Sequence, residues 1–152
     1  MSDVAKSEKE LTPQEKMAAR FETERSKVSK EIYENIGYLS SLNTLGQAQV
    51  NMLSLRQRLL EDNHTLLEHI TKLQRDYRKK RALALEQLST NQQYRFQSKE
   101  KDALVDGKLS DTKQWLEMFE NQVQFFNDTM RTVDNIIFGL KTRLDIEKTV
   151  GM

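Results

Sequence analysis

The sequence has no cysteine, one proline and five glycines among its 152 residues. The missing cysteines exclude a disulfide framework, a thiolate metal site and a cysteine nucleophile, which fits a reducing compartment. The shortage of proline and glycine argues against a globular α/β or β domain, because such folds need many turns whereas long helices need few. With 31% charged and 37% apolar residues, the composition favours an elongated, helical protein.

A long apolar run is also missing. No stretch approaches the roughly 20 apolar residues needed to span a bilayer. The polar amino terminus, MSDVAKSEKELTPQEK, lacks the apolar centre of a secretory signal. We therefore expect a soluble, intracellular protein with no membrane partner. The net charge of +1 provides no whole-molecule field that would attract nucleic acid, so such binding would require locally clustered charge.

Residues that could support catalysis or hold a metal are scarce. His64 and His69 are five residues apart, which on a helix spoils the geometry of a two-histidine metal site, so we interpret both as surface residues. There is no phosphate-cradling glycine loop, and the carboxylates are interspersed with lysine and arginine as on solvated helix faces. We expect no enzymatic activity, no catalytic residue, no metal or other cofactor, and no small-molecule substrate.

The sequence does contain a regular apolar pattern near its carboxyl end. Apolar residues recur in alternating steps of three and four, an average of 3.5 residues, which keeps them on one seam of an α-helix. The seam consists of Leu116, Phe119, Val123, Phe126, Met130, Val133, Ile137, Leu140 and Leu144. Further aromatic and branched residues beside it make it wider than one neighbour would cover, so we expect homo-oligomerisation through it. The core face of a monomeric bundle would show the same pattern.

Two further helices are predicted upstream. Thr12, Pro13 and Glu15 signal a helix start, because threonine can cap free amides, proline suits the first turn and glutamate completes a capping box. Apolar residues are sparse in this helix, so we expect it to pack weakly at first and more firmly near Ile32.

After Gly37 a second seam begins, with leucine or methionine every seven residues: Leu45, Met52, Leu59, Leu66 and Leu73. We place its helix from about Leu42 or Gln47 to about Leu88. Polar residues weaken such packing but can fix its register. Three of them occupy interleaved sites: Gln49, Arg56 and Asn63.

These patterns divide the chain into three parts. We expect a disordered polar tail at residues 1–11, a helical region with a basic cluster at residues 12–103, and a long oligomerisation helix at residues 108–152. Periodicity is lost over residues 89–111, where Asp106 followed by glycine is a turn signal that would lay the last helix beside an earlier one. The predicted fold is all-α, an elongated helical hairpin or bundle with coiled-coil-like seams that assembles into a homo-oligomer.

The basic cluster lies in KLQRDYRKKRALAL, where six cations and the single acid Asp76 give a local charge of +5. Several of these side chains could reach phosphates together, which would release counterions and make binding salt-dependent. Downstream, QQYRFQSK places two aromatic residues around an arginine, an arrangement suited to stacking on unpaired bases. The candidate nucleic-acid-binding residues are Arg75, Arg78, Lys79, Lys80, Arg81, Tyr94, Arg95, Phe96 and Lys99. A solvated helix end and loop-anchoring aromatic residues are the alternative interpretations.

The carboxyl-terminal half, about residues 75–151, resembles the UvsY family of phage recombination mediators. The resemblance is carried by RKKRALAL and by VDGKLSDTKQWLEMFENQVQFFNDTMRTVDNIIFGLKTRLDIEKTVG, which has the family's acidic turn and long apolar helix. The closing segment is similar to the family's pattern of a lysine, an acidic residue, a basic residue and a glycine, here Lys141, Asp145, Lys148 and Gly151.

This resemblance implies a small helical homo-oligomer that binds single-stranded DNA in DNA recombination and repair. It would help to load a recombinase onto strands covered by a single-strand-binding protein, in the host cytoplasm if a phage encodes it. The carboxyl-terminal seam would form the hub of a ring-like oligomer, while basic residues from each copy meet the strand. The alternative is a non-enzymatic coiled-coil structural or assembly scaffold, whose basic cluster pairs with an acidic partner or keeps the helix soluble.

Overall fold

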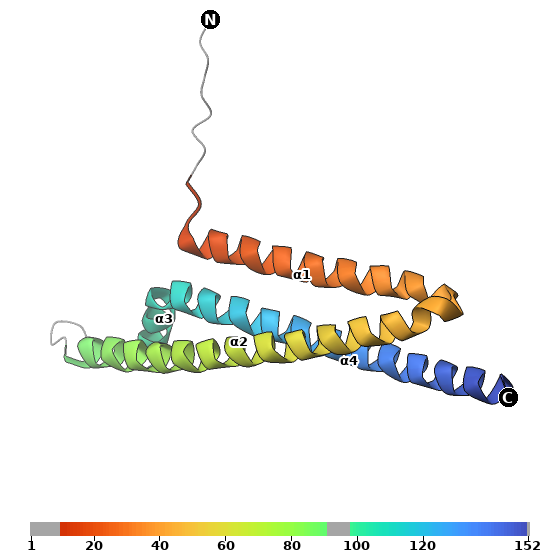
Figure 1. Ribbon diagram of the computed structural model, residues 1–152. Helices are drawn as coiled ribbons and strands as arrows, with labels where there is room; N and C mark the ends of the chain where they lie inside the picture. Colours follow the sequence, from red (N-terminus) through yellow and green to blue (C-terminus); the bar gives the residue numbers. More distant parts are fainter. Residues whose placement is uncertain (1–9, 91–97, 152) are drawn as a thin grey trace, which may run out of the picture.

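The structure, a computed structural model, describes residues 10–90 and 98–151. Within these two ranges the chain forms four α-helices and a short 3₁₀ turn, without a strand. In chain order they are α1 (Pro13–Gly37), η1 (Tyr38–Ser40), α2 (Leu42–Thr90), α3 (Ser98–Lys108) and α4 (Ser110–Val150) (Figure 1). The predicted all-α fold is confirmed. Most of the tail predicted at residues 1–11 lies outside the described residues.

The start of α1 is fixed by its cap. The Thr12 hydroxyl oxygen accepts a hydrogen bond from the Glu15 amide at 3.2 Å, and the Glu15 carboxylate accepts one from the Thr12 amide at 3.1 Å. Pro13 occupies the first helical position, where its missing N–H removes no intrahelical bond. The predicted capping box is therefore confirmed.

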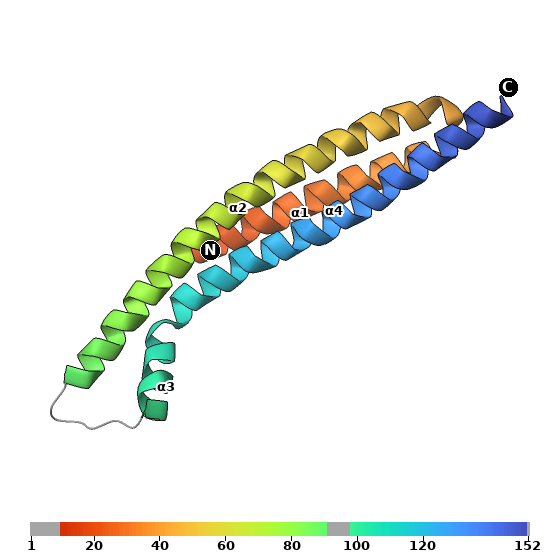
Figure 2. The ribbon, with the colours of Figure 1, turned by 90° about the horizontal axis from the view of Figure 1, so that it is seen from below.

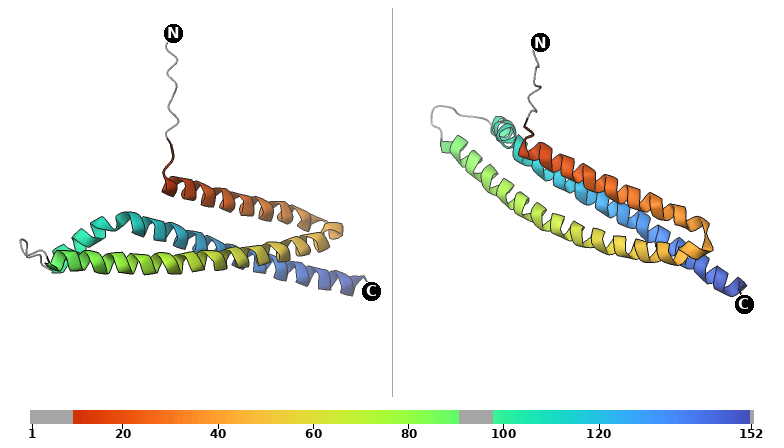
Figure 3. Two further views of the ribbon diagram at one scale, coloured as in Figure 1. Left: turned by 60° about the vertical axis from the view of Figure 1, so that its left-hand side comes forward. Right: turned by 45° about the horizontal axis from the view of Figure 1, so that its top comes forward.

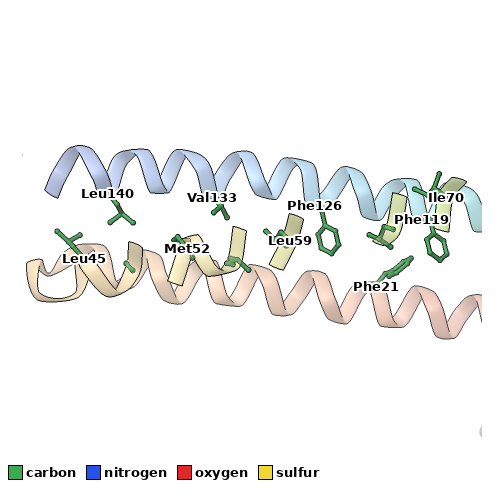
Figure 4. Packing of buried hydrophobic residues seen from close by; sticks show 12 residues of the cluster. Phe21, Leu45, Met52, Leu59, Ile70, Phe119, Phe126, Val133 and Leu140 are labelled. Carbon is green, nitrogen blue, oxygen red and sulfur yellow. The ribbon is translucent and has the colours of Figure 1, made fainter. Parts of the chain in front are cut away.

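The main packing interface joins α2 and α4, which run side by side in opposite directions (Figure 2). The close-up in Figure 4 shows three facing layers: Leu45 with Leu140, Met52 with Val133, and Leu59 with Phe126. All six side chains are at most 2% exposed. Burying a side chain of this size stabilises the fold by about 1.5–3 kcal/mol, so these layers hold the two long helices together. α2 begins at Leu42 and ends at Thr90, two residues beyond the predicted end.

All nine residues of the predicted carboxyl-terminal seam pack in the core of the single chain. Four are buried: Phe119, Phe126, Val133 and Leu140. Five are partly buried against the same core: Leu116, Val123, Met130, Ile137 and Leu144. In the single chain, residues of α2 and α1 contact this seam, and its packing on copies of itself stays a prediction.

α1 is less deeply packed than its neighbours. Its one buried apolar residue is Phe21, whose ring meets that of Phe119 edge-on with the centroids 5.0 Å apart. The firmer packing expected near Ile32 is not found, because Ile32 is partly buried and Ile36 is exposed. Figure 1 shows that α1 diverges from α2 towards its amino end, where Phe21 packs against Phe119 of α4.

Polar contacts fasten α1 to the other two long helices. Arg25 Nη1 donates to Oε1 of the fully buried Gln122 on α4 at 2.8 Å. On α2, Asn51 Nδ2 donates to Asn35 Oδ1 at 2.9 Å, and Arg58 forms an ion pair with Glu31. The attachment of α1 thus depends on hydrogen-bonding geometry as well as on apolar burial.

The sequence pattern does not predict α3, which lies in a segment interpreted as loop. The helix continues through Asp106 and Gly107, and the chain changes direction at Leu109 instead of at the predicted turn (Figure 3). Val105 and Leu109 are buried against Ala84 of α2 and form a second, smaller core. Packing of these two side chains keeps the residues between them helical and moves the bend towards α4.

Candidate nucleic-acid interface

The basic cluster occupies the last third of α2, at the end of the molecule where α3 packs (Figure 3). α2 continues through the cluster because its inner face continues too: Tyr77 is half-buried and Ala84 is buried. With this face directed inward, steps of three and four residues place Lys72, Arg75 and Lys79 together on the solvent side.

Four of the candidate contact residues are exposed along this stretch: Arg75, Arg78, Lys79 and Lys80. None of the four forms an ion pair with another residue that the structure describes. Asp76, the one acid within the cluster, is also exposed. These side chains can therefore turn towards an anionic ligand without breaking a contact within the fold.

Arg81 behaves differently, because it is drawn towards α3. Its guanidinium Nη2 lies 3.5 Å from the Asp102 Oδ1, and its Nε is buried with no hydrogen-bond partner among the described residues. The side chain is half-buried. Arg81 is thus partly neutralised by an acid within the fold, and the outward-facing charge lies mainly on the four residues before it.

Lys99 is brought to the same end of the molecule by α3. It is exposed in the first turn of that helix, which packs on α2 through the small core around Val105. The predicted stacking residues, Tyr94 and Phe96, and the arginine between them, Arg95, lie outside the described residues.

Sequence reasoning missed the role of α3 in this region. Asp102 pairs with Arg81, and Val105 fixes the helix that carries both Asp102 and Lys99. One signal was available, since Tyr77 and Ala84 continue the seven-residue spacing of the inner face past the cluster and therefore require a packing partner there.

The histidines do not form a metal site. Both are exposed: His64 lies 3.4 Å from the Glu68 carboxylate, and the His69 ring contacts Phe119 with the centroids 5.9 Å apart. Over residues 10–90 and 98–151, no three His, Cys, Asp or Glu side chains gather in a way that could hold a metal ion.

A cavity of about 360 Å³ lies where α1 diverges from α2. Its apolar lining includes Phe21, Leu66 and Phe119. At its rim, Arg20 and Glu24 pair with each other at 3.5 Å. Asp62 and His69 also line the cavity, so its apolar surface is bordered by polar groups as well.

Comparison with known proteins finds no family model, curated protein or solved structure that matches the chain. None of the helices in the described part of the chain is long and apolar enough to cross a membrane.

Proposed function

We propose that this protein is a non-enzymatic recombination mediator that binds single-stranded DNA and helps to load a recombinase onto it. The observation that carries the proposal is the exposed basic face of α2, where Arg75, Arg78, Lys79 and Lys80 are free of ion pairs with other described residues. Cations spread over the exposed surface of a helix can contact a phosphate backbone without reading its sequence. The resemblance of residues 75–151 to the UvsY family supports the same function.

Multivalency is part of this proposal. Four outward cations on one chain form a small site, and a homo-oligomer would present several such sites to the same strand. Linked weak sites raise the apparent affinity without any new contact, because the second site binds as if its ligand were locally concentrated. A recombinase and a single-strand-binding protein are the proposed further partners.

A coiled-coil scaffold is the second candidate, and the Arg81 contact favours it. Arg81 pairs with Asp102 of its own chain, which shows that part of the basic cluster is used in packing the fold. In a scaffold the remaining cations would pair with an acidic protein or keep the long helix soluble. The two candidates differ in whether single-stranded DNA binds at all.

The test is fluorescence anisotropy of a labelled single-stranded oligonucleotide, titrated with protein at several salt concentrations and with duplex as competitor. We expect salt-sensitive binding that prefers the single strand. Changing Arg78, Lys79 and Lys80 together to alanine should weaken binding. It should also lower the slope of log affinity against log salt by about 2, since each lost phosphate contact on a single strand contributes about 0.7.

A matched control removes the same charge elsewhere. Lys16, Lys27 and Lys30 are exposed on α1, and changing all three to alanine should leave most of the binding in place. Equal losses in the two triple variants would show that only net charge matters. No binding at low salt by the folded protein would overturn the mediator proposal in favour of the scaffold.

A further inference from the structure

A flank of α2, about 100° around the helix from its buried row, carries a second row of large apolar residues. Val50, Leu53, Leu60 and Leu67 are 60%, 50%, 44% and 44% exposed. We call these four residues the outer stripe. Each leucine directly follows a buried residue of the α2 core, namely Met52, Leu59 and Leu66, so the helix has an apolar row on two of its faces.

The spacing of the outer stripe is that of a coiled coil. The three leucines are seven residues apart, and Val50, Gln57 and His64 interleave with them in steps of three and four. In heptad terms leucine occupies every d position, while valine, glutamine and histidine occupy the a positions. Leucine at d suits a two-stranded parallel coiled coil, and polar a residues limit the number of strands and fix the register.

We propose that the outer stripe binds the outer stripe of a second copy of this chain, forming a parallel two-stranded coiled coil. The inference deepens the homo-oligomer of the proposed function by assigning it a surface. Single exposed apolar residues are common on proteins, but a row repeated every seven residues along one helix matches a helical partner with the same repeat.

The charges beside the stripe select a second copy in parallel orientation. In a parallel coiled coil, the g residue of one helix lies beside the e residue five positions later on the other helix. Here Arg56 occupies a g position and Glu61 the following e position, so Arg56 would lie beside Glu61 of the second copy. The equivalent position one heptad later is Asn63, which is buried against α4 and therefore does not reach Glu68 of the second copy. An antiparallel pair centred on Leu60 would instead bring the two Glu61 side chains together, which is repulsive.

The charged side chains beside the outer stripe are exposed enough to form ion pairs with a second copy. Glu61 and Glu68 are exposed, and their present partners within the chain are Gln57 and His64, one helical turn away. Arg56 pairs with Asp134 of α4 through Nε at 2.5 Å, and its side chain is still 39% exposed. Its remaining guanidinium donors leave room for a second carboxylate.

Parallel pairing has a consequence for the basic cluster. The cluster begins at Lys72, five residues after Leu67 and about 7.5 Å further along the helix axis, so the two clusters of a parallel dimer would lie next to each other. An antiparallel dimer centred on Leu60 would hold Arg78 of each copy about 54 Å apart. The parallel arrangement therefore doubles the local cation density that one strand meets.

The chain has no cysteine, so a single engineered cysteine can form a disulfide only with the same cysteine of another copy. In the parallel pair Gln57 faces Gln57 of the second copy, whereas in the antiparallel pair it faces position 63. We expect Gln57→Cys to form a disulfide-linked dimer on air oxidation, and Ser26→Cys, exposed on α1, to remain mostly monomeric. A dimer yield from Gln57→Cys no higher than that of the Ser26→Cys control would overturn the proposal.

A second measurement does not depend on the thiol. Light scattering of the full chain should give the mass of a dimer or a multiple of it, and Leu60→Asp should halve that mass while the helical circular dichroism stays unchanged. Leu104→Asp, at an equally exposed site on α3, should leave the mass unaltered. A monomeric wild-type chain, or a Leu60→Asp mass equal to that of the wild type, would refute the assignment.

DNA binding separates this inference from the proposed function. If Gln57→Cys cross-links into a dimer but the protein does not bind single-stranded DNA, the outer-stripe dimer would be supported and the mediator function contradicted. The opposite outcome is a monomeric wild-type protein that binds single-stranded DNA as well as the Leu60→Asp variant does. That result would support DNA binding and overturn the proposed dimer.

Discussion

Replacing Asn63 by leucine would measure what a buried amide costs the α2–α4 interface. Asn63 is 7% exposed, and its Nδ2 donates to Asn127 Oδ1 at 3.1 Å. Its own Oδ1 is buried with no hydrogen-bond partner among the described residues. An unpaired buried acceptor costs about 1–3 kcal/mol, whereas the one hydrogen bond contributes about 0.5–1.5 kcal/mol. Because leucine also adds apolar contact beside Leu59 and Ile70, we expect Asn63→Leu to raise the free energy of unfolding by about 1–2 kcal/mol.

Urea unfolding followed by circular dichroism would test this value. The midpoint should rise while the slope stays unchanged, since the slope follows the surface exposed on unfolding. Asn63→Ala removes the same amide without filling its space, so it should be less stable than the leucine variant by about 2 kcal/mol or more. A leucine variant less stable than the wild type would refute the reasoning. It would mean that the Asn63 carbonyl has a partner such as water, or that the amide fixes the register of the two helices.

Three further substitutions test other parts of the packing. Val133→Asp places an unpaired carboxylate at a fully buried position and should abolish cooperative unfolding; a normal melting curve by circular dichroism would contradict the core described for α4. Gln122→Ala removes the acceptor of Arg25 and should speed amide hydrogen exchange in α1 while α2 and α4 stay protected; uniform loss of protection would mean that α1 is not a separate unit. Val105→Ala should raise hydrogen exchange across α3 alone, since that residue anchors it to α2; an unchanged α3 would show that its helix does not depend on this contact.

The long helices could be predicted because their signals are local and repeated. The cap at Thr12 needs only three residues, and the seven-residue spacing of α2 recurs from Leu45 to Leu73. What spacing cannot decide is the identity of the partner. The seam on α4 would look the same facing another copy or facing α2, and the structure places it against α2 and α1.

The end of the molecule around α3 was harder to predict. α3 has one buried residue, Val105, so its sequence has too little apolar periodicity to indicate a helix. Its position depends on a contact with Ala84, a residue that alone gives no strong signal of burial. Arg81 shows how this affects the candidate site. Local charge predicts that Arg81 contacts DNA, but it does not predict the ion pair with Asp102, which forms only because α3 folds against α2.

The successive contacts of α2 with α3 and α4 predict an order in which the helices pack. Paired residues are 21 positions apart at Arg81 and Asp102, 64 at Asn63 and Asn127, and 78 at Arg56 and Asp134. Closing the widest loop first would cost the most chain entropy, whereas starting from the pair between α2 and α3 divides the closure into smaller steps. We therefore expect the two long helices to pair from the α3 end outward. On this pathway the small core of Ala84, Val105 and Leu109 belongs to the folding nucleus, whereas the layer of Leu45 and Leu140 forms last and opens first.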